Sequence, residues 1–107
     1  MNKFEKMLSS DNIYDKRVKV LSKSAELAQE NIINKLKTTK TELELKIFNL
    51  TDLAPNSTDS LRPDSKNWDA AKWAKALQEA KQDLYMCEIQ LDIAKKTLSE
   101  YFTEEND

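Results

Sequence analysis

The fold is decided by the stretch from Trp73 to Tyr101, which reads WAKALQEAKQDLYMCEIQLDIAKKTLSEY. Leucines recur in it every seven residues, and a second set of residues follows each leucine by three. The leucines are Leu77, Leu84, Leu91 and Leu98, and the second set is Ala80, Cys87, Ala94 and Tyr101. Uninterrupted steps of three and four are typical of a coiled-coil seam. The stretch therefore predicts a long helix that packs along one stripe against another helix.

The composition of the whole chain also indicates helix. The chain has 107 residues, no glycine, two prolines and 34% charged residues. Sheets and tight turns normally need glycine at positive φ, so a glycine-free, charge-rich chain reads as nearly all helix. We expect one all-α domain over residues 1–107, folded as a long antiparallel helical hairpin with coiled-coil character.

Five segments follow from the hydrophobic spacing and the turn residues. Residues 1–9 predict a short amphipathic helical segment, and residues 12–53 the first long helix. Residues 54–66 hold both prolines and predict a loop. Residues 66–102 predict the second long helix. The acidic residues 103–107 are expected to fray, because negative charge is unfavourable at a helix C-terminus.

The first long helix carries two apolar stripes. The principal stripe is Tyr14, Val18, Leu21, Ala25, Ala28, Ile32, Leu36, Thr39, Leu43, Ile47 and Leu50; the flanking stripe is Ile13, Val20, Leu27, Ile33, Leu45 and Phe48. Three threonines among residues 37–41 weaken the helix locally, since threonine has a poor helix propensity. A continuous helix with a soft patch is favoured there over a bend.

Folding about the centre of the loop predicts which residues meet across the hairpin. Ala25 is expected near Ala94, Ile32 near Cys87, and Val18 near Tyr101. Small residues on the second helix would let the two backbones approach closely. Asp64 or Ser65 is the expected N-cap of the second helix.

Two helices form only one seam, so the flanking stripes are expected to stay exposed. Contiguous exposed apolar residues usually mark a partner surface. We therefore predict a homodimer that forms a four-helix bundle, together with docking of a further protein. The predicted contact residues are Val20, Leu27, Ile33, Trp68, Tyr85, Ile89 and Ile93. The alternative is that residues 1–9 fold back and cover part of this surface.

Several chemistries lack their usual residues. The chain has no histidine, no glycine and a single cysteine. It therefore lacks the commonest general base and metal ligand, and it cannot form a glycine-rich phosphate loop. Cys87 falls on the seam and predicts a buried structural thiol. We expect no enzyme activity and no catalytic, cofactor-binding or metal-binding residues.

Nucleic-acid binding is the next alternative. Lys16, Arg17, Lys19 and Lys23 give the first helix a basic patch that could contact phosphates. The chain as a whole has a formal net charge of −2 and a pI near 5.3, which favours a solvated helix face instead.

The predicted function is accordingly broad. We expect a non-enzymatic protein–protein interaction module, such as an adaptor, a small inhibitor or an assembly factor. The lysine- and asparagine-rich composition suits an accessory protein of a phage. A single cysteine and the lack of a long apolar run favour a cytoplasmic protein that is not bound to a membrane. The alternatives are a structural subunit of a larger assembly and nucleic-acid binding through Lys16–Lys23.

Overall fold

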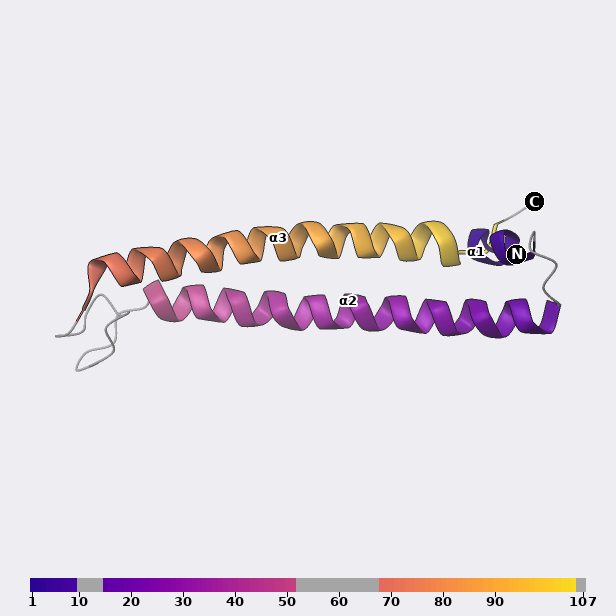
Figure 1. Cartoon of the computed structure of the whole chain (residues 1–107), viewed down its shortest axis with the longest axis horizontal. Helices are drawn as coiled ribbons and strands as arrows, with labels where there is room; N and C mark the ends of the chain where they lie inside the picture. The colour runs from indigo at the N-terminus through magenta and orange to yellow at the C-terminus, as the bar shows by residue number, and fades with distance from the viewer. Residues whose placement is uncertain (10–14, 52–67, 106–107) are drawn as a thin grey trace. The chain divides into compact units, whose positions relative to one another are not determined.

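The computed structural model describes residues 1–9, 15–51 and 68–105. Three α-helices make up nearly all of these residues: α1 (Lys3–Ser9), α2 (Asp15–Thr51) and α3 (Ala70–Phe102) (Figure 1). The only strand-like pairing in the described ranges is an isolated bridge between Asn2 and Glu104. The all-α prediction is confirmed. None of the helices in these ranges combines the length and hydrophobicity that a bilayer crossing requires.

The start of the second long helix differs from the prediction. Trp68 and Asp69 are not helical, and α3 begins at Ala70 rather than at residue 66. Asp69 is the N-cap, because its Oδ1 accepts hydrogen bonds from the backbone N–H groups of Ala71 (3.1 Å) and Lys72 (3.2 Å). The predicted caps, Asp64 and Ser65, lie outside the described residues, as do the predicted loop 54–66 and the ends of the first helix at 12–14 and 52–53.

The helix α2 runs without interruption through the threonine-rich patch, so the continuous helix predicted there is confirmed. The Thr41 hydroxyl donates to the carbonyl oxygen of Lys37 at 3.1 Å, which satisfies it within its own helix. The same patch begins at a boundary between two compact units. Unit 1 comprises Met1–Leu36 and Gln90–Asp107, and unit 2 comprises Lys37–Ile89.

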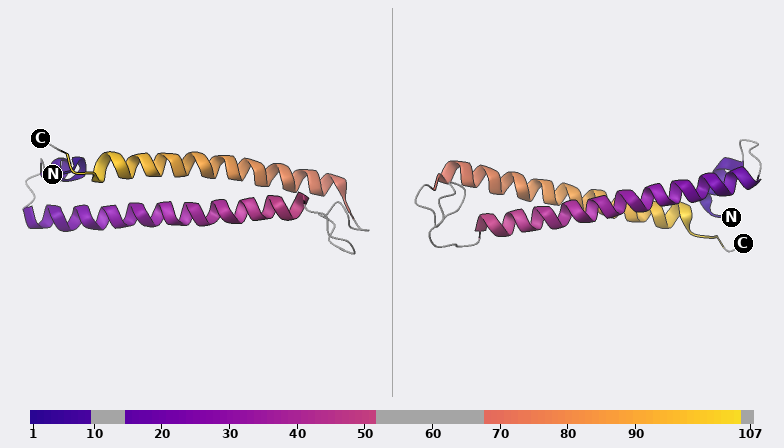
Figure 2. Two further views of the ribbon diagram at one scale, coloured as in Figure 1. Left: turned by 180° about the vertical axis from the view of Figure 1, so that it is seen from behind. Right: turned by 90° about the horizontal axis from the view of Figure 1, so that it is seen from below.

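In unit 1, the first part of α2 packs antiparallel to the last part of α3 (Figures 1 and 2). The core holds Ile33, Leu91 and Ala94, with Leu36 and Leu98 packed against them. Gln29 Nε2 donates to the carbonyl oxygen of Ala94 at 3.0 Å, which ties the two helices together beside this core. The helical hairpin is therefore confirmed in this unit.

The short helix α1 docks on the same end of unit 1 as the last turn of α3. Asn2 caps it in a reciprocal capping box: the Asn2 side chain accepts the Glu5 N–H at 2.8 Å, and Glu5 accepts the Asn2 N–H at 3.1 Å. The Asn2 amide also donates to the Ser22 hydroxyl on α2 at 3.1 Å. The Phe4 ring packs on the Phe102 ring with centroids 5.2 Å apart. A seven-residue helix is marginal alone, so these contacts hold it.

The described tail residues 103–105 are not helical, and two of them pair with the N-terminal segment. The Met1 amino group lies 3.0 Å from Glu104, and Lys6 pairs with Glu105. Lys3 pairs with Glu100 on α3 at 2.6 Å. The opposite charges of α1 offset the unfavourable position of these carboxylates beyond a helix C-terminus.

Unit 2 is a second antiparallel stretch of α2 and α3. The indole Nε1 of Trp73 donates to the carbonyl oxygen of Leu50 at 2.7 Å. The Trp68 ring meets the Trp73 ring edge-on, with centroids 5.7 Å apart. Ala80 and Cys87 are buried, as predicted for the small residues of the seam. The hairpin is thus also confirmed in unit 2.

The pairing between the helices differs from the prediction by one helical turn. The Ala94 carbonyl accepts from Gln29, which lies one turn after the predicted neighbour Ala25. The phase of α2 differs as well. Ile32, predicted to be in the seam, is 47% exposed, whereas Ile33, predicted to be on the exposed flank, is 6% exposed.

The neighbouring isoleucines give a matched test of this phase. Ile33→Ala is expected to lower the free energy of unfolding by about 2–4 kcal/mol, because it leaves a cavity in the core. Ile32→Ala is expected to cost less than about 1 kcal/mol, because half of the side chain is already in water. Urea unfolding of dilute protein, followed by circular dichroism, measures both. Equal losses would contradict the observed phase.

The Lys3–Glu100 pair gives a test of α1 docking. The hydrogen bond to Glu100 and its negative charge raise the pKa of Lys3 above its ordinary value of 10.5. A raised pKa means that the pair contributes to docking below pH 10.5 and that the contribution is lost as the pH rises through the raised value. In ¹³C NMR titrations, Glu100→Gln should move the Lys3 pKa down toward 10.5. The control Glu88→Gln, in unit 2, should leave it unchanged. An unchanged Lys3 titration in both variants would show that the ion pair does not form.

Candidate functional site

The candidate site is an apolar groove on one face of unit 1, formed by two adjoining hollows. One hollow, of about 390 Å³, is lined by Gln29, Ile32, Leu36, Gln90, Ile93, Ala94 and Thr97. The other, of about 400 Å³, is lined by Phe4, Met7, Ala25, Ala28, Gln29, Ile32, Thr97, Tyr101 and Phe102. Gln29, Ile32 and Thr97 line both hollows, so they form one groove, which we call the unit 1 groove.

Small residues and side-chain hydrogen bonds shape this groove. Ala25 and Ala28 on α2 and Ala94 on α3 leave space between the larger side chains. The Gln29 amide donates to the Ala94 carbonyl, and the Thr97 hydroxyl donates to the Ile93 carbonyl at 2.9 Å. Both polar side chains thus make a hydrogen bond within the chain. The groove therefore presents mostly methyl, methylene and aromatic surface.

The described lining of the groove contains no aspartate, glutamate, lysine or arginine. The chain as a whole is 34% charged, so a surface of this size would ordinarily carry several charges. Ile32 on α2 and Ile93 on α3 are 47% and 59% exposed, and Met7 of α1 is exposed at one end. Large apolar side chains exposed together in an uncharged concave surface are typical of a docking site for another apolar surface.

The structure separates the residues that the sequence grouped into one contact surface. Ile93 lines the groove. Val20 and Leu27 are 65% and 48% exposed, but they do not line it. Ile33 is in the core, so its assignment to the contact surface is wrong. The reason is the phase of α2, in which the polar residues Ser22 and Gln29 occupy inward positions that an apolar pattern does not reveal.

Ile93 is the predicted contact residue that lines the groove, and the groove residues that sequence reasoning missed include Met7 and Ile32. Met7 was assigned to the short amphipathic segment, and its position beside α2 depends on the docking of α1. Ile32 was assigned to the seam because it continues the four-residue steps from Ala28. The adjacent isoleucine at position 33 was the signal in the sequence, because either Ile32 or Ile33 could face inward.

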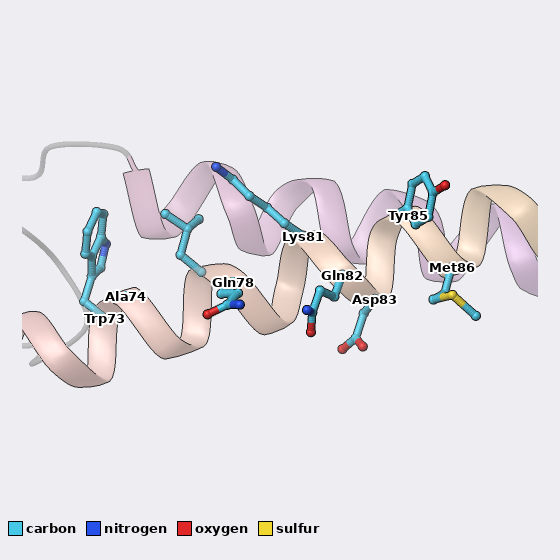
Figure 3. Close-up of a pocket in the computed structure, with 9 residues that line it drawn as sticks. Trp73, Ala74, Gln78, Lys81, Gln82, Asp83, Tyr85 and Met86 are labelled. Atoms are coloured by element: carbon cyan, nitrogen blue, oxygen red, sulfur yellow. The ribbon is translucent and has the colours of Figure 1, made fainter.

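Unit 2 has a different exposed surface, on α3. Tyr85 and Ile89, both predicted contact residues, are exposed there, as is Met86. An open hollow of about 830 Å³ next to them is lined by Trp73, Ala74, Leu77, Gln78, Lys81, Gln82, Asp83, Tyr85 and Met86. Figure 3 shows Trp73 and Tyr85 on one side of the α3 ribbon and Asp83 and Met86 on the other. Unlike the unit 1 groove, this surface includes charged residues.

Trp68 lies just before α3 and is 40% exposed. Its edge-on contact with Trp73 accounts for part of its surface, while the rest remains accessible. The structure thus places Trp68 at the start of α3 in unit 2, whereas Ile93 belongs to unit 1.

The basic patch of α2 is exposed, with one ion pair. Lys16, Lys19 and Lys23 share one side of α2 by their three- and four-residue spacing, and Arg17 lies about 200° from Lys19 around the helix. Lys23 is 3.7 Å from Glu26. Three lysines on one side, one of them paired, make a small cationic surface.

The described residues hold no cluster of three or more histidine, cysteine or acidic side chains that could bind a metal ion. Cys87, the single cysteine, is buried in unit 2 as predicted. No protein-family model, curated protein or solved structure matches this chain. The unit 1 groove and the α3 surface of unit 2 are therefore the features on which a function can be argued.

Proposed function

We propose that this protein is a non-enzymatic interaction module of the cytoplasm that forms a homodimer and binds another protein through exposed apolar helix surfaces. It would act as an adaptor, a small inhibitor or an assembly factor. The observation that carries the proposal is the uncharged lining of the unit 1 groove in a chain that is 34% charged. The lysine- and asparagine-rich, glycine-free composition supports an accessory protein of a phage.

The dimensions of the groove favour a helix as its occupant. Its lining extends along α2 from Ala25 to Leu36, which corresponds to about 16 Å or three helical turns. An amphipathic helix that places residues at steps of three and four into such a groove is a recurrent mode of recognition. Each Å² of apolar surface removed from water contributes about 25 cal/mol, so covering Ile32 and Ile93 is favourable.

Photo-crosslinking in the cells that make the protein tests this proposal. A benzophenone amino acid replaces Ile93 in unit 1 or Tyr85 in unit 2. In the matched control it replaces Lys72, an exposed charged residue of α3. Protein adducts are expected from Ile93 and Tyr85 at several times the yield from Lys72. Equal yields at all three positions would contradict a role for the apolar surfaces.

Two other functions have a specific observation behind them. The exposed Lys16, Lys19 and Lys23 favour nucleic-acid binding, and two separate apolar surfaces on one chain favour a structural subunit that assembles through head-to-tail contacts. Concentration-dependent rings or filaments in electron micrographs would distinguish the second from a closed dimer.

The nucleic-acid alternative makes its own prediction. Binding through three lysines should weaken steeply with salt, because each phosphate contact releases a counterion. Lys16→Glu with Lys19→Glu should abolish any gel shift of DNA or RNA at low salt, whereas the control pair Lys95→Glu with Lys96→Glu, on α3, should retain it. The absence of any shift by the wild-type protein would remove this alternative.

A further inference from the structure

We infer that the occupant of the unit 1 groove is a second copy of this chain, packed about a two-fold axis with Ile32 and Ile93 at the centre of the contact. The inference rests on the proposed function and specifies the partner of one of its two surfaces. In such a contact, α2 and α3 of unit 1 from each copy together form a four-helix bundle.

The first argument is the charge of the groove. In a two-fold contact, residues near the axis face their own copies, so any charge there meets a like charge and destabilises the pair. None of the described lining residues is charged, although 34% of the chain is. A different protein partner would favour complementary charges on the docking surface, because they guide encounter and exclude wrong partners. The uncharged lining therefore fits a second copy best.

The second argument is the thin core of unit 1. The buried cluster comprises Ile33, Leu91 and Ala94, and Val18 is the only large side chain that is fully buried in the described part of the chain. A small unit with so few buried apolar side chains gains much from further burial. A second copy is present wherever the chain is made, and it would cover Ile32 and Ile93 in both copies at once.

The third argument concerns two polar side chains of the groove, Gln29 and Thr97. Gln29 and Thr97 line both hollows, and each donates to a carbonyl of α3 in its own chain. Each of these two side chains keeps one hydrogen bond when an apolar surface covers it, which lowers the cost of burying them. The same groove on a second copy is such an apolar surface.

The surface of unit 2 lacks these properties. Lys81 and Asp83 line the hollow beside Tyr85, so this surface offers a partner charged groups as well as apolar ones. That surface is left for the other protein of the proposed function. The two surfaces therefore divide between self-association and partner binding.

Sedimentation equilibrium of the full chain, over about 1–500 μM, tests the inference. The short groove predicts a dimer with a dissociation constant in the micromolar range. The double variant Ile32→Ser, Ile93→Ser is expected to raise this constant at least tenfold. The control double variant Leu27→Ser, Tyr85→Ser removes side chains that are 48% and 65% exposed, close to the 47% and 59% of Ile32 and Ile93. It should change the dissociation constant less than twofold.

Two results would overturn the inference: a wild-type chain that stays monomeric over this range, or a dimer that the control variant disrupts and the groove variant does not. Isotope-filtered NMR on mixed labelled and unlabelled wild-type protein guards against a variant that unfolds. It should show contacts between chains at the Ile32 and Ile93 methyl groups, and contacts elsewhere would reject this arrangement. Photo-crosslinks from Tyr85 to another protein would persist in either case, so the partner-binding part of the proposed function is tested separately.

Discussion

The hydrogen bond from the Gln29 side chain to the Ala94 carbonyl joins the two helices of unit 1 at the point where they approach closely. Alanine at position 94 leaves room for an amide to cross to a backbone oxygen. Because Gln29 faces α3, Ile33 one turn later also faces it, and Ile32 is turned outward. The rotation of α2 that brings Gln29 to the Ala94 carbonyl thus also places Ile33 in the core and Ile32 in the lining of the groove.

This constraint also explains how far the sequence could predict the helix pair. The seam of α3 was predictable because every inward position is apolar or small, from Trp73 through Leu91 to Ala94. The seam of α2 was predictable only in part: Val18 and Leu50 are buried as predicted, but Ser22 and Gln29 occupy inward positions and make hydrogen bonds there. A prediction based on apolar residues alone passes over such polar positions and assigns the nearest leucine or isoleucine to the seam. At Ile32 and Ile33 the predicted seam is wrong by one residue, so the surface side chain Ile32 was predicted in the core in place of Ile33.

The ends of the hairpin show a second limit of prediction from sequence. The helical spacing of Phe4, Met7 and Leu8 was enough to predict α1, and the acidity of the tail was evident. The pairing of Lys3 with Glu100 joins residues far apart in the chain, and no local pattern encodes it. The groove shares this limit, because Met7 reaches it only through the docking of α1. The exposed positions of Tyr85, Ile89 and Ile93 were predictable because they follow from helix periodicity alone.

The tryptophan pair has a consequence for how the two units can be studied. The chain has two tryptophans, and Trp68 and Trp73 both belong to unit 2, where their rings are in contact and Trp73 donates to the Leu50 carbonyl. Their fluorescence therefore reports on unit 2 alone, while the helical ellipticity reports on both units. If α2 melts in two steps that divide at Leu36 and Lys37, the emission and the ellipticity will follow different curves. The protein thus carries an intrinsic spectroscopic probe of whether its two units unfold as one cooperative structure.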